Sequence, residues 1–129
     1  VLQHPGIKSI TEIKSGVFSH GPWDEKLLIV DGIKLSLNDI EHRILRGIWN
    51  DPRIHAAVNC ASISCPNLQE TPFVAKHIYV QLNQAFGQFV NSPKGLEIKN
   101  NSIYLSQIFS WYGEDFGDKK QMREFVSGD

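Results

Sequence analysis

The sequence predicts an α+β fold, a single domain with β-hairpins packed against helices. Three observations support this class. Residues 26–36 and 96–105 each consist of two β-type runs on either side of a turn dipeptide. Residues 37–49 and 73–90 carry apolar side chains at helical spacing. The composition, 41% hydrophobic and 21% charged over 129 residues, is that of an ordinary globular domain with one core.

Charge and hydropathy exclude two classes of partner. The formal net charge is −1 at pH 7, so no overall positive field attracts nucleic acid. No apolar run approaches the roughly 20 residues that a membrane span requires. The stretch GVFSHGP has neither the spacing nor the lysine of a phosphate-binding loop, and we expect no cofactor.

Each expected hairpin has a dipeptide suited to a tight turn. Asp31-Gly32 is a favoured dipeptide of the type I′ turn, in which both residues need a positive φ. Asn100-Asn101 is expected to make the turn of the second hairpin.

Capping residues and apolar stripes mark the two longer helices. The first is expected to begin after Ser36, with Asp39 three residues on in a variant of the capping box. The second is expected to begin with Thr71 as its cap and Pro72 in its first turn. The apolar stripe of this second helix consists of Val74, Ile78, Leu82, Phe86 and Phe89.

Both cysteines of the chain lie in the stretch DPRIHAAVNCASISCP, residues 51–66. Residues 54–60 read as a short strand, in which alternate side chains point to opposite faces. Cys60 then shares the apolar face, where a free cysteine behaves as a small buried hydrophobe. His55 and Asn59 share the other face and are expected to line a polar pocket. A structural, hydrogen-bonded His55 stays open as the alternative.

Cys65 is the leading candidate for a nucleophile. Pro66 follows it, and proline favours the first position of a helix, so we expect the Cys65 sulfur at a helix N-terminus. The partial positive charge there stabilises the thiolate, which is the reactive form. A Cys60–Cys65 disulfide stays open if the segment ASIS turns back. Zinc is a weaker alternative because the spacing is unusual and no His-x₃-His pair is present, so no metal site is expected.

Glu41 falls near the middle of the apolar face of the first helix, where an ionised carboxylate needs a partner. We therefore expect its side chain to be largely buried and held by arginine, histidine or backbone donors. His42 lies on the flank of that face. An acid, a histidine and a cysteine are compatible with thiol activation, in which the histidine takes the proton. The alternative is a structural ion pair of Glu41 with Arg43, Arg46 or Arg53.

Three segments of the chain resemble the signature blocks of the family known as domain of unknown function 547. These segments are SLNDIEHRILR, DPRIHAAVNCASISCPNL and IYLSQIFSWYGEDF, in this order over nearly the whole chain. The resemblance implies a further N-terminal helix, so residues 1–129 are expected to be one such domain without its N-terminal part. It also implies export if the protein is bacterial, or the cytoplasm and fusion to leucine-zipper-like, glutaredoxin or DEP domains if it is from a plant. The resemblance to this family implies no particular activity.

The leading hypothesis is a thiol-dependent hydrolase or transferase of papain- or transglutaminase-like fold, acting on an acyl or amide group of a peptide or small molecule. Its expected residues are Cys65 as nucleophile with Cys60 in reserve, His42 or His55 as base, and Glu41 or Asn59 as the orienting group. Two alternatives stay open. One is a noncatalytic binding or scaffold module for a peptide or small molecule, and the other is a structural-disulfide or redox-associated domain. The oligomeric state stays open as well.

Overall fold

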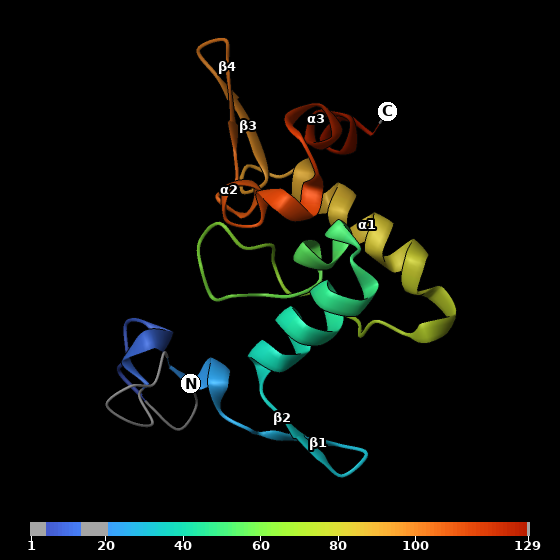
Figure 1. The fold of residues 1–129 in the computed structure, drawn as a ribbon. Coiled ribbons are helices and arrows are strands. Elements are labelled where there is room, and N and C mark those ends of the chain that lie inside the picture. Colours follow the sequence, from blue (N-terminus) through green and yellow to red (C-terminus); the bar gives the residue numbers. More distant parts are fainter. Residues whose placement is uncertain (1–4, 14–20, 129) are drawn as a thin grey trace. The chain divides into compact units, whose positions relative to one another are not determined.

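The computed structural model describes residues 5–13 and 21–128 and divides into two compact units, residues 1–49 and 50–129 (Figure 1). The N-terminal unit contains η1 (Ile10–Glu12), η2 (Pro22–Asp24), β1 (Leu28–Val30), β2 (Ile33–Leu35) and η3 (Asp39–Trp49). The C-terminal unit contains η4 (Pro52–Ala56), η5 (Ala75–His77), α1 (Ile78–Val90), β3 (Leu96–Lys99), β4 (Ser102–Leu105), α2 (Ile108–Trp111), η6 (Gly113–Phe116) and α3 (Lys119–Ser127). The predicted α+β class is confirmed. The extent of the domain over residues 1–129 and the expected N-terminal truncation stay predictions.

Both predicted hairpins are present, and their turns follow from the turn dipeptides. β1 pairs with β2 and β3 with β4, each pair antiparallel. Asp31 and Gly32 have φ of 50° and 77°, and Asn100 and Asn101 have φ of 49° and 59°. Positive φ at both central residues is the geometry of the type I′ turn. The prediction of both hairpins is confirmed.

The start of η3 also follows the predicted capping chemistry. The N–H of Asp39 donates to Ser36 Oγ over 3.1 Å, and the N–H of Ser36 donates to Asp39 Oδ2 over 2.7 Å. These reciprocal bonds satisfy two backbone donors at the helix start. The helix has wide, π-type turns. The α-helical spacing used to assign its apolar face from the sequence therefore does not apply to it. Asp39 is the buried acid, whereas Glu41 is half-buried. That the Glu41 carboxylate is largely buried and held by a partner stays a prediction.

The predicted strand over residues 54–60 is wrong, because its first half belongs to the 3₁₀ helix η4. Asp51 caps this helix by accepting the N–H of Arg53 over 3.0 Å, and Pro52 occupies its first turn. A capping acid followed by proline starts a helix, and this local signal outweighs the β-type pattern of the residues that follow. The assignment of His55, Asn59 and Cys60 to strand faces therefore does not hold.

The second long helix begins later than predicted. Thr71 and Pro72 precede it, and the chain enters α1 through η5. The side chain of Gln81 fastens this entry, because it accepts the N–H of Val74 over 2.8 Å and donates to the Pro72 carbonyl over 3.0 Å. The buried face of α1 consists of Leu82, Ala85, Phe86, Phe89 and Val90.

The hydrophobic core of the C-terminal unit is largely aromatic. Phe86 packs on Phe125 with ring centroids 4.7 Å apart, and Phe109 lies 4.9 Å from Phe116. Offset and edge contacts of this kind add to the free energy gained from burial. The cluster joins η4, α1, α2, η6 and α3, and its buried members are Ala56, Cys65, Ala85, Phe86, Phe89, Val90, Ile108, Phe109 and Phe116.

Candidate functional site

Cys60 and Cys65 form a disulfide, and their Cα atoms are 6.2 Å apart. That separation lies within the usual range for disulfides. Cys65 is 1% exposed and lies in the aromatic core, whereas Cys60 is half-buried. The disulfide that the sequence left open as an alternative is therefore the form that the structure has.

The predicted position of Cys65 at a helix N-terminus is wrong. Residues 66–74 form the later part of the long loop drawn in green in Figure 1, and the next helical turn begins at Ala75. Proline suits the first turn of a helix but does not start one alone. Pro72 works against a helix here, because it lacks an N–H and disfavours the helical conformation of the residue before it.

Asn59 closes the base of the disulfide loop. Its Nδ2 donates to the Pro66 carbonyl over 2.7 Å, and its Oδ1 accepts the N–H of Ala61 over 2.8 Å. Farther along the loop, Ser106 Oγ donates to the Ser64 carbonyl over 2.8 Å and so connects the loop to the start of α2. Both ends of the Asn59 amide therefore bind backbone of this loop. Its predicted role as the orienting group of a base stays a prediction.

His55 is buried and paired with an acid that the sequence analysis does not select. His55 Nε2 lies 2.7 Å from Asp115 Oδ2, and the ring stacks on Tyr112 with centroids 4.2 Å apart. The ring of Phe116 lies 5.6 Å away. The His55 side chain is 1% exposed and that of Asp115 is 14% exposed. A carboxylate beside Nε2 fixes the orientation of the imidazole and favours the tautomer with its proton on that nitrogen.

The pairing of His55 with Asp115 joins residues 60 positions apart in the chain. In the sequence Asp115 stands beside Glu114 and close to Asp118, a pattern typical of an exposed acidic face. A signal that could have identified it is the pair of aromatic neighbours, Tyr112 and Phe116. Such neighbours place an acid close to a core, where it needs a partner.

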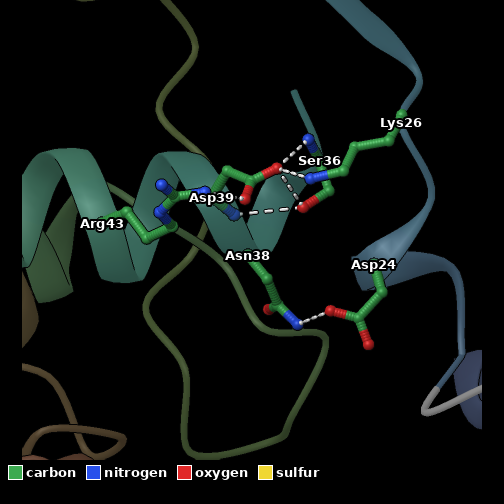
Figure 2. A network of polar contacts seen from close by, with 6 residues as sticks. All are labelled: Asp24, Lys26, Ser36, Asn38, Asp39 and Arg43. Atoms are coloured by element: carbon green, nitrogen blue, oxygen red, sulfur yellow. Dashed lines mark hydrogen bonds and ion pairs between the residues drawn. The ribbon is translucent and has the colours of Figure 1, made fainter. Parts of the chain in front are cut away.

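In the N-terminal unit, Asp39 is the centre of a polar network (Figure 2). Its carboxylate accepts hydrogen bonds from the Lys26 ammonium, from the N–H and hydroxyl of Ser36, and from Arg43 Nη1 over 3.3 Å. The Lys26 ammonium foremost, then the N–H of Ser36, holds the pKa of Asp39 well below its usual value, although burial acts the other way. These bonds connect the segment before β1 to the start of η3.

The other two predicted residues lie on η3 in the N-terminal unit. His42 is exposed, and its Nδ1 lies 3.2 Å from Arg46 Nη1, one turn along the helix. Glu41 is the half-buried neighbour of His42. The cysteines and His55 belong to the C-terminal unit. The roles predicted for Glu41 and His42 toward a cysteine stay predictions.

Among the described residues of the C-terminal unit, two grooves are large enough to hold a ligand. One, of about 380 Å³, runs along α1 and is lined by Pro66, Asn67, Gln69, Ala85, Gln88, Phe89, Ser92, Pro93 and Lys94. The other, of about 450 Å³, is lined by residues of β3, β4 and α3. Both volumes are in the range of ligand pockets in proteins.

The described ranges 5–13 and 21–128 bear on two further kinds of site, those for metal ions and for membranes. There, no three His, Cys, Asp or Glu side chains are grouped closely enough to bind a metal ion. Within the same ranges, no helix has the length and apolar character needed to cross a bilayer.

The comparisons with known proteins give one match. The family model described as "Protein of unknown function, DUF547" matches residues 7–90, about two-thirds of the chain. No curated protein matches the chain, and neither does any solved structure.

Proposed function

Because the chain belongs to the DUF547 family, a family of unknown function, we propose its function from the geometry of the site. The C-terminal unit is a noncatalytic binding domain, and Cys60–Cys65 is a structural disulfide of that domain. The disulfide is the observation that carries this proposal. The thiolate is the nucleophilic form of cysteine, and a cysteine whose sulfur is bonded in a disulfide cannot form a thiolate.

Burial supports the same conclusion. Cys65 is 1% exposed, so a substrate could reach its sulfur only if the core opened. Asn59 and Ser106 use their side-chain polar groups to hold the loop between the two cysteines. A loop fastened in this way resembles a structural element more than a reactive one. The two open grooves of about 380 and 450 Å³ supply the surfaces on which such a domain would bind a ligand.

One observation favours a second candidate, a thiol-dependent hydrolase or transferase that works after reduction of the disulfide. The Asp115 carboxylate orients the ring of His55 in the way that an acid orients the base of a catalytic triad. In this alternative an external dithiol reduces the disulfide and becomes oxidised itself. His55 would then take the proton of the Cys65 thiol. A buried acid–histidine pair is also a common structural feature, so this candidate is the weaker one.

Alkylation of the reduced, folded protein distinguishes the two candidates. Tris(2-carboxyethyl)phosphine reduces the disulfide, and iodoacetamide labelling is followed across a pH series, with Cys60→Ser and Cys65→Ser variants to assign the signals. The proposal predicts that Cys60 labels with a midpoint near the ordinary thiol pKa of about 8.5 and that Cys65 labels only with unfolding.

The catalytic alternative predicts the reverse. Cys65 would label fast, with a midpoint well below 8.5, and His55→Ala would raise that midpoint. His77→Ala is the matched control, because His77 is an exposed histidine of the same unit. Fast labelling of Cys65 that depends on His55 and not on His77 would overturn the noncatalytic proposal.

A further inference from the structure

The hairpin β3–β4 has one apolar face. Leu96 lies opposite Leu105, and Ile98 lies opposite Ile103. Side chains alternate between the two faces of a strand, so these four residues share one face. Ile98 is 69% exposed and Ile103 is 67% exposed, so the outer half of this face is open to solvent. A two-stranded hairpin is only marginally stable unless such a face is covered.

Leu96, Ile103 and Leu105 of this face form one wall of the groove of about 450 Å³, and residues of α3 form the other. The hairpin β3–β4 and α3 are labelled in Figure 1. Met122 and Val126 of α3 are half-buried and also pack against the aromatic core. The groove floor is therefore apolar and rests on a packed helix. The residues that line the groove are Leu96, Ile103, Leu105, Lys119, Met122, Arg123, Val126 and Ser127.

The charged residues of this groove are both cations. Lys119 and Arg123 are four residues apart on α3, so they lie on the same side of that helix. The nearby acids have other partners: Glu124 pairs with Lys120, and Glu97 with Lys99. Among the residues that the structure describes, no carboxylate lies within ion-pair distance of Lys119 or Arg123. The rim of the groove thus carries positive charge that is not neutralised there.

We propose that this groove binds the apolar face of an acidic, amphipathic helix of a partner protein. The inference rests on the proposed function and names the class of partner that the binding domain takes. A partner helix with aliphatic side chains along one face would cover Ile98 and Ile103 and fill the floor, as in other helix-in-groove complexes. Two acids one turn apart on that helix would match the spacing of Lys119 and Arg123.

The test uses the full 129-residue chain and two synthetic peptides. The first is a fluorescein-labelled helix of about 18 residues, long enough to fold alone, with leucines along one face and glutamates beside it. The second has lysine in place of each glutamate. Fluorescence anisotropy at low salt measures binding, and circular dichroism confirms that every variant is folded.

The proposal predicts that the acidic peptide binds the wild-type chain. Combined Lys119→Glu and Arg123→Glu substitutions weaken that binding by at least about tenfold and strengthen binding of the lysine peptide, because the sign of the rim is reversed. Ile103→Ser weakens binding of the acidic peptide by about tenfold through loss of apolar contact. Lys76→Glu and Ile63→Ser are the matched controls, since both residues are exposed on the same unit outside the groove, and they leave binding unchanged.

Three results would overturn the proposal. One is no saturable binding of the acidic peptide, and another is an equal loss in the control variants. In the third, the chain binds vesicles of phosphatidylserine and phosphatidylcholine but not the peptide, and the Lys119 and Arg123 substitutions abolish vesicle binding. This result would assign the groove to a membrane surface. A thiol titration of the same sample separates this inference from the proposed function. An intact disulfide without peptide binding rejects only the partner, whereas reactive Cys65 rejects the noncatalytic function.

Discussion

Replacement of Cys60 by alanine tests the structural role of the disulfide. Cys60 is the half-buried cysteine, so the substitution removes the bond and leaves the buried Cys65 in place. In the chain-entropy model, closing the loop between residues 60 and 65 restricts the unfolded chain and is worth about 2 kcal/mol at 25 °C. Asn59 and Ser106 still hold the loop in the folded variant. We therefore expect the free energy of unfolding of the C-terminal unit to fall by about 2 kcal/mol.

Urea denaturation followed by tryptophan fluorescence measures this change, and a thermal scan should show a decrease in Tm of about 10 °C. Reduction should destabilise the wild-type chain by the same amount and leave the variant unaffected. Ser62→Ala is the control, because it alters the same loop without removing the bond. The disulfide would have no stabilising role if Cys60→Ala were as stable as the wild type, or if reduction destabilised the variant as well.

Three further predictions concern other parts of the chain. Gly95→Ala would make a Cβ clash with the Phe89 carbonyl oxygen, a backbone atom, and should lower the free energy of unfolding by about 1–3 kcal/mol in urea titrations. An unchanged midpoint would contradict the close packing of Gly95 on the end of α1. Asp39 has a lowered pKa in the folded state, so its contribution to stability is present above the unfolded value of about 4 and is lost as the pH falls further. The free energy of unfolding, measured from pH 6 to pH 2, should fall with pH in the wild type and fall less in Asp39→Asn. Equal pH profiles of the two proteins would show that the Asp39 network does not stabilise the fold. Asp115→Asn replaces the charged acceptor of His55 by an amide and should lower the free energy of unfolding by about 1–3 kcal/mol in calorimetry. Asp118→Asn is the control and should change it by much less; an equal loss in both variants would contradict a specific role of the His55–Asp115 pair.

The sequence predicts best those features that a few neighbouring residues determine. Asp31-Gly32 sets the first hairpin turn, and the reciprocal bonds of Ser36 and Asp39 set the start of η3. The error at η4 is also local. There the β-type pattern of the residues competes with a capping aspartate and a proline, and the cap determines the structure.

The features that determine the candidate site depend on contacts between distant parts of the chain. His55 meets Asp115 only because η4 and η6 pack against the same aromatic core. Neither the periodicity nor the spacing near His55 carries information about that contact. The burial of Cys65 has the same origin, since α1 and α2 supply the core around it. The sequence therefore favours the chemistry of an accessible thiol in a stretch whose two cysteines form a disulfide, with Cys65 in the core.

The proposed function depends on a structural disulfide between Cys60 and Cys65. The most direct measurement is the intact mass of protein purified without reductant and treated with iodoacetamide in guanidinium chloride, where every free thiol is accessible. The protein should gain no carbamidomethyl group before reduction and two after reduction. Two groups added without any reductant would show that the sulfurs are not bonded and would contradict the proposed function.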